Sequence, residues 1–167
     1  MWLALSDLFR ARWTSMIHDE WMRNLLANRP DLKHEDLART RSLMDAHVRD
    51  CVVTGFEPLI ASIALPDADD RHVVAAAVHS GAQRIITFNL TDFPDEQLQP
   101  LGLQAVHPDG FVLDLLNKDP DKVCQAVAMH RRTLKNPPKS GEAYLDTLLK
   151  QGLPQTVEGM LSFLPAI

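Results

Sequence analysis

The sequence is poor in cysteine, glycine and aromatic residues. Its 167 residues include 2 cysteines, 7 glycines and 6% aromatics. Cys51 and Cys124 lie far apart and match no metal-binding or redox spacing, which excludes zinc fingers and dithiol oxidoreductases. Two thiols without a secretory signal are typical of a reducing cytosol. We therefore expect a cytoplasmic protein.

Long apolar runs and runs of Lys or Arg are also missing. The N-terminal stretch MWLALSDLFRAR reaches charged residues too early for a signal peptide or membrane anchor, so we expect no membrane association. The net charge is −5, and any contact with nucleic acid must therefore use a local patch or metal ions. The length of 167 residues is that of about one domain. A composition of 46% hydrophobic and 23% charged residues predicts a globular protein with a buried core.

Strand-like and helix-like segments alternate up to residue 116. Short, partly β-branched or alternating segments predict strands at 8–13, 50–55, 84–88 and 103–108. Helical spacing predicts a helix that begins at Thr14 or Ser15, a second helix over 34–48, and a third that opens at Asp70 and ends at Gly81. This alternation favours an α/β fold with a mainly parallel sheet.

The pattern changes at Asn117. Three amphipathic helices are predicted in DPDKVCQAVAMHRRTL, SGEAYLDTLLKQG and PQTVEGMLSFL, with Pro- and Gly-rich joints between them. The sequence therefore predicts two parts, an α/β domain over 1–116 and an all-helical extension over 117–167.

Acidic or amide side chains follow the predicted strands at three places. In an open parallel sheet, ligands collect at the carboxyl ends of the strands. Converging carboxylates suit a hard cation such as Mg²⁺ or Mn²⁺, which can activate a water and neutralise a phosphodiester's developing charge. The alternative is an acidic helix start, favoured by the helix dipole, beside a polar turn. The side chains concerned are Asp19 and Glu20; Asp67, Asp69 and Asp70; and Asn89 and Asp92.

Three stretches resemble a known family: IHDEW, LPDADDRHVVAAAVHSGAQRIITFNLTDFP and HPDGFVLDLL. They are similar to PIN-domain proteins, particularly the bacterial ribonuclease toxins of the VapC type, and the similarity covers residues 1–116. The resemblance implies a parallel sheet flanked by helices and Mg²⁺- or Mn²⁺-dependent cleavage of RNA. It places the metal and catalytic residues at Glu20, Asp70, Asn89 and Asp92, with Asp69 as an alternative metal ligand and Asp67 as a weaker one.

The chain departs from that family at its N-terminus. The family begins with a strand that ends in an aspartate, whereas MWLALSDLF matches only the end of the helix that follows, and Asp7 cannot replace the missing ligand. We therefore expect a toxin-type endoribonuclease with reduced or no turnover. The alternative is a non-catalytic PIN remnant that acts as a dimerisation or interaction module. The partners implied are RNA, an antitoxin protein and a second copy of the chain.

Overall fold

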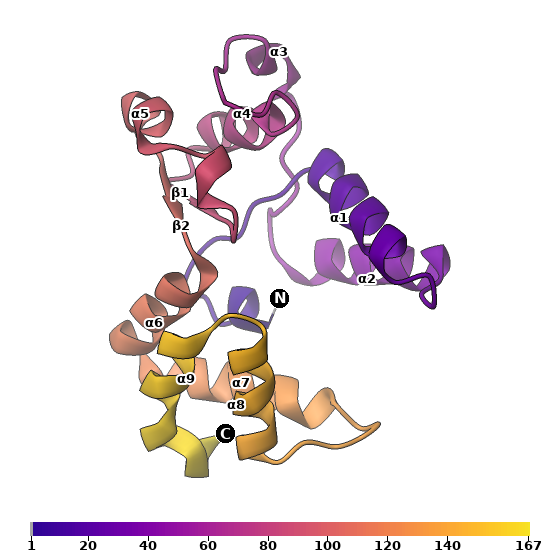
Figure 1. Ribbon diagram of the computed structural model, residues 1–167, viewed down its shortest axis with the longest axis vertical. Helices are drawn as coiled ribbons and strands as arrows, with labels where there is room; N and C mark the ends of the chain where they lie inside the picture. Colours follow the sequence, from indigo (N-terminus) through magenta and orange to yellow (C-terminus); the bar gives the residue numbers. More distant parts are fainter. Residues whose placement is uncertain (1) are drawn as a thin grey trace. The chain divides into compact units, whose positions relative to one another are not determined.

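The computed structural model describes residues 2–167, and helices make up most of it (Figure 1). The elements follow one another along the chain in this order: η1 (Trp2–Leu5), α1 (Ser15–Asn28), α2 (His34–His47), α3 (Glu57–Ile60), α4 (Arg71–Ser80), β1 (Arg84–Ile86), η2 (Leu90–Asp92), α5 (Asp95–Leu98), η3 (Gln99–Leu101), β2 (Gln104–Val106), α6 (Pro108–Lys118), α7 (Pro120–Thr133), α8 (Gly141–Lys150), α9 (Pro154–Met160) and η4 (Leu161–Ala166).

The sheet consists of β1 and β2, which run parallel. The amide of Gln104 donates to the carbonyl of Gln83, and the amide of Thr87 donates to that of Val106, each at 3.1 Å. The predicted α/β class with a helical extension is confirmed, and the arrangement is consistent with a PIN-like core. The strand predicted at 84–88 is shorter than expected and only half-buried, because Ile85 is buried while its two neighbours in β1 are exposed.

The strands predicted at 8–13 and 50–55 were wrong in extent. They meet only at one isolated parallel bridge between Trp13 and Val52. The Trp13 amide donates to the Cys51 carbonyl and the Val53 amide donates to the Trp13 carbonyl, both at 2.8 Å. The segment 50–55 was predicted to be buried, and Cys51 and Val53 are buried whereas Val52 is exposed. A strand needs a hydrogen-bonding partner along its whole length, and an alternating sequence alone does not supply that partner.

The helix boundaries agree closely with the sequence. Thr14 caps α1, with its side chain accepting from the Ile17 amide at 3.1 Å. Asp70 occupies the N-cap position of α4, and Gly81 ends that helix in the left-handed conformation. The capping preference of threonine therefore predicted the start of α1, and the preference for glycine at helix ends predicted the end of α4.

The chain divides into two compact units, each with its own core. Unit 1 comprises residues 1–9, 86–88 and 106–167, so α6 groups with the tail helices; unit 2 comprises 10–85 and 89–105. The core of unit 2 packs around α4 and includes Phe56, Val74 and Leu98. The core of unit 1 includes Val123, Tyr144 and Met160. Within residues 2–167, no helix has the length and apolar character needed to cross a membrane.

Candidate functional site

Asp70 lies at the centre of the acidic residues in unit 2. It stands at the N-cap position of α4, but its half-buried side chain makes no capping hydrogen bond. Burial raises the pKa of the Asp70 carboxyl, and the negative charges of Glu20, Asp92 and Asp67 raise it further. Carboxylates from α1, from the loop before α4 and from η2 therefore act on one another at this point.

Glu20 reaches this site from α1. Its Oε2 atom lies 3.4 Å from Nε2 of His72, which is in the first turn of α4 and is 6% exposed. Among residues 2–167, Nδ1 of His72 has no hydrogen-bond partner. The Glu20–His72 pair therefore fixes the Glu20 carboxylate beside the start of α4. His72 was not identified as a site residue from the sequence, although its place two residues after Asp70 was a usable signal.

The third contribution comes from the turn that follows β1. The Asn89 side-chain amide donates to Oδ2 of Asp92, and the Thr91 hydroxyl donates to Oδ1 of Asn89 at 2.6 Å. Buried Phe93 anchors the end of this turn in the core. The Asn89 side-chain amide therefore orients the carboxylate of Asp92, which is itself a residue of the candidate site.

The neighbouring aspartates differ in environment. Asp69 is exposed and is not among the charges that shift the pKa of Asp70. Its backbone amide donates to Oδ1 of Asp67 at 2.8 Å, which closes a local turn. The structure therefore brings Glu20, Asp67, Asp70 and Asp92 together electrostatically and leaves Asp69 outside the group.

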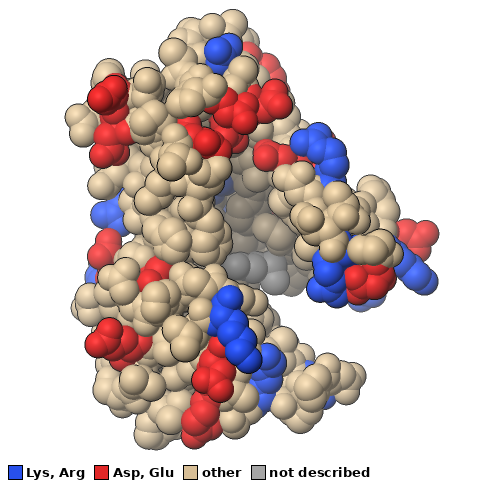
Figure 2. All heavy atoms as spheres, viewed as in Figure 1, with Lys and Arg blue, Asp and Glu red and all other residues tan. Residues whose placement is uncertain are grey.

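The chemistry of these donors suits a hard divalent cation, because all of them are carboxylate oxygens. Figure 2 shows acidic side chains gathered around α4. Within residues 2–167, however, no three or more His, Cys, Asp or Glu side chains are placed close enough to hold a metal ion. A cation at Asp70 would therefore have to draw the side chains inward.

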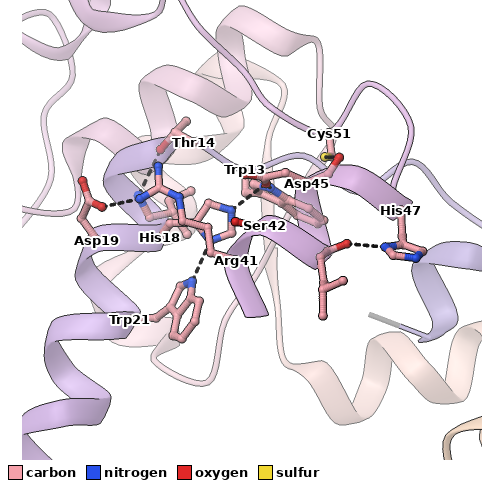
Figure 3. A network of polar contacts seen from close by, with 12 residues as sticks. Trp13, Thr14, His18, Asp19, Trp21, Arg41, Ser42, Asp45, His47 and Cys51 are labelled. Atoms are coloured by element: carbon pink, nitrogen blue, oxygen red, sulfur yellow. Dashed lines mark hydrogen bonds and ion pairs between the residues drawn. The ribbon is translucent and has the colours of Figure 1, made fainter. Parts of the chain in front are cut away.

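A polar network centred on the buried His18 supports α1 (Figure 3). The Trp21 indole N–H donates to Nδ1 of His18 at 2.9 Å. Nδ1 is therefore an acceptor, and Nε2 carries the hydrogen that is donated to Oδ1 of Asp45 at 3.0 Å. The Trp13 indole donates to the same oxygen at 2.7 Å. Burial raises the pKa of Asp45, but these hydrogen bonds outweigh burial and leave it below its usual value.

This network orients the helix that carries Glu20. His18 is 1% exposed, so it is a structural residue out of reach of a substrate. It connects α1 to α2, and the ion pair between Arg41 and Asp19 at 2.7 Å does the same at the surface. The sequence did not reveal the network because Asp45 lies 27 residues from His18.

Comparison with known proteins finds two similarities, each over part of the chain. Residues 108–161, which span α6 to α9, match the family described as the VapC50 C-terminal domain. A Mycobacterium tuberculosis protein named "Putative ribonuclease VapC50" is 38% identical over 97 residues, which is 58% of this chain. The chain is therefore similar to VapC-type proteins over part of its length.

The match to this VapC-type relative is partial. It spans 57% of the relative's length. No solved structure matches the chain significantly. The family match covers residues 108–161, from α6 to α9, which carry none of the acidic residues of the candidate site. The 97 residues that match the relative are more than the chain has from residue 108 onward, so that match also includes part of the chain before residue 108.

Proposed function

We propose that this chain is a metal-dependent endoribonuclease of the VapC type. The observation that supports the proposal is the raised pKa of the half-buried Asp70, caused by burial and by the charges of Glu20 and Asp92, together with the contact that holds Glu20 at His72 beside the start of α4. The relative's name as a ribonuclease supports RNA as the substrate. An antitoxin protein, a second copy of the chain and a cytoplasmic location belong to the same proposal.

In this proposal Glu20, Asp70 and Asp92 hold Mg²⁺ or Mn²⁺. When bound, the ion supplies an activated water and neutralises the charge that develops on the phosphodiester. Burial, and then repulsion from the neighbouring carboxylates, raise the pKa of Asp70, and a bound cation relieves that repulsion. Asn89 positions Asp92, and the pair with His72 positions Glu20.

Cleavage of a labelled RNA in Mn²⁺ tests this function. We expect the wild-type chain to cleave and the Asp70→Asn variant to lose about 100-fold of that rate, the upper end of the loss typical for residues that support a metal site. Asp69→Asn is the matched control. It removes one negative charge next to Asp70, and Asp69 is not among the charges that shift the pKa of Asp70. Its backbone amide still bonds to Asp67, so we expect cleavage close to wild type.

The second candidate is a non-catalytic interaction module. It is favoured by the fact that no close set of three metal-ligating side chains occurs in the part of the chain described. It predicts that wild type, Asp70→Asn and Asp69→Asn all give the same background cleavage in Mn²⁺. That result would contradict the nuclease proposal, whereas selective loss in Asp70→Asn would contradict the interaction module.

A further inference from the structure

One stretch of unit 1 is basic although the chain is acidic overall. No Asp or Glu occurs between Asp121 and Glu142, in a chain of net charge −5. Residues 130–139, HRRTLKNPPK, carry four of the five cations in that interval, and we name them the basic turn. These four are Arg131, Arg132, Lys135 and Lys139.

Two of these cations hold the basic turn in shape. An Arg131 guanidinium N–H donates to the Lys139 carbonyl at 2.7 Å, and the Lys139 ammonium donates to the Thr147 hydroxyl of α8. An antiparallel bridge between Lys135 and Pro138 closes the turn. These contacts therefore hold the basic turn in a defined position relative to α7 and α8.

The end of α7 is fixed as well. The His130 ring stacks on Trp2, with ring centroids 6.4 Å apart and planes 26° apart. Nδ1 of His130 lies 2.7 Å from the buried hydroxyl of Tyr144. The last turn of α7 thus presents its outward side chains from a rigid base.

The other two cations, Arg132 and Lys135, point their charge to solvent. Both residues are exposed, and neither makes an ion pair or side-chain hydrogen bond with residues 2–167. The pKa of Glu142 is lowered by hydrogen bonds to its own backbone amide and to Ser140, and to a smaller extent by the charge of Arg131. Arg132 and Lys135 are therefore unneutralised charges on a preorganised turn.

The simplest rival explanation is helix capping. Cations in the last turn of a helix interact favourably with the helix dipole. That explanation covers Arg132 at the end of α7, but Lys135 lies beyond the helix. Lys118 and Lys150 occupy the last turns of α6 and α8 and are also exposed, so they provide matched controls for a capping role.

We infer that the basic turn binds the phosphate backbone of single-stranded RNA. Two exposed cations on a rigid turn supply phosphate contacts that do not depend on base sequence. The choice of RNA as the polyanion rests on the proposed nuclease function. The basic turn then contributes to RNA binding, and the acidic residues around Asp70 carry out the proposed cleavage.

Fluorescence anisotropy of a labelled single-stranded RNA in EDTA tests this inference without cleavage. We expect the double variant Arg132→Ala with Lys135→Ala to bind about tenfold more weakly than wild type. Its plot of log affinity against log salt should be shallower by about 1.4, the value for two lost single-strand phosphate contacts. The charge-conserving pair Arg132→Lys with Lys135→Arg should retain most of the binding.

The control double variant, Lys118→Ala with Lys150→Ala, removes the same charge from two helix ends of the same unit. We expect it to bind RNA as wild type does. Equal weakening by the two alanine pairs would show a general charge effect and overturn the inference, as would no weakening by either pair.

Failure of this inference and failure of the nuclease proposal give different results. Cleavage lost in Asp70→Asn, together with RNA binding unaffected by the basic-turn substitutions, overturns only the inference. RNA binding that depends on the basic turn, together with no Mn²⁺-dependent cleavage, overturns only the nuclease proposal.

Discussion

Asp109 shows how one buried carboxylate joins two helices. It lies in the first turn of α6, is 2% exposed, and accepts hydrogen bonds from the amides of Gln155 and Thr156 at 2.9 and 2.7 Å. The Thr156 hydroxyl donates back to the Asp109 carbonyl at 3.1 Å. Asp109 therefore satisfies amides at the start of α9 that have no partner within that helix.

These contacts give the stability of the fold a defined pH dependence. Burial raises the pKa of Asp109, but the hydrogen bonds from Thr156 and Gln155 outweigh it, so the folded-state pKa is lowered. A lowered carboxyl pKa gives stability that is present above the unfolded-state value and is lost as the pH falls through the folded-state value.

We predict that Asp109→Asn lowers the free energy of unfolding by about 2 kcal/mol at neutral pH, because the amide cannot accept both bonds as a carboxylate does. Urea unfolding across a pH series measures this effect. The difference between variant and wild type should narrow as the pH falls through the acidic range. A difference that stays constant with pH would show that the charge of Asp109 does not matter.

Single residues were predictable from the sequence where their role is local. Thr14 and Gly81 were identified from the preferences of helix ends, and both were confirmed. Asp70, Glu20 and Asp92 were selected through the family resemblance, and their assignment as metal ligands stays a prediction. Neither periodicity nor the resemblance pointed to Asp109, because its partners lie 46 and 47 residues away.

Among the secondary-structure elements, the helices were easier to predict than the strands. A helix makes its hydrogen bonds within one segment, so its pattern is complete in the local sequence. A strand depends on a distant partner, and only Trp13 of residues 8–13 finds one, at Val52. This is why the predicted strands shrank to β1, β2 and one bridge.

Two glycines test whether backbone conformation at a helix end requires glycine. Gly81 ends α4 with a φ of +67°, and a Cβ built there meets no atom within 4 Å. The Gly81→Ala substitution should therefore destabilise the protein through backbone strain alone, by about 1 kcal/mol.

Gly110 in α6 also has open space around its Cβ position, but it does not have a positive φ. The Gly110→Ala substitution should stabilise the protein by about 0.5 kcal/mol, because alanine loses less backbone freedom on folding. Thermal melts of both variants measure the contrast. The same sign of change in the two proteins would be inconsistent with this account of Gly81.

Taken as a whole, the chain has local groups of charge of both signs. Acidic residues act on Asp70 in unit 2, and the basic turn belongs to unit 1. The net charge of −5 does not reveal the basic turn. The need for a local patch or a metal ion was predictable from that net charge, but the basic turn was not singled out, because the rigid support from α8 depends on folding.

Whether the acidic group binds a divalent cation is the claim on which the proposed function depends most. Titration of Mn²⁺, followed by the loss of the electron paramagnetic resonance signal of the free ion, measures this binding directly and needs no RNA. Wild type, Asp70→Asn and Asp69→Asn are compared at one protein concentration. We predict that wild type and Asp69→Asn remove the free-ion signal while Asp70→Asn leaves most of it. Equal signal with all three proteins would contradict the account.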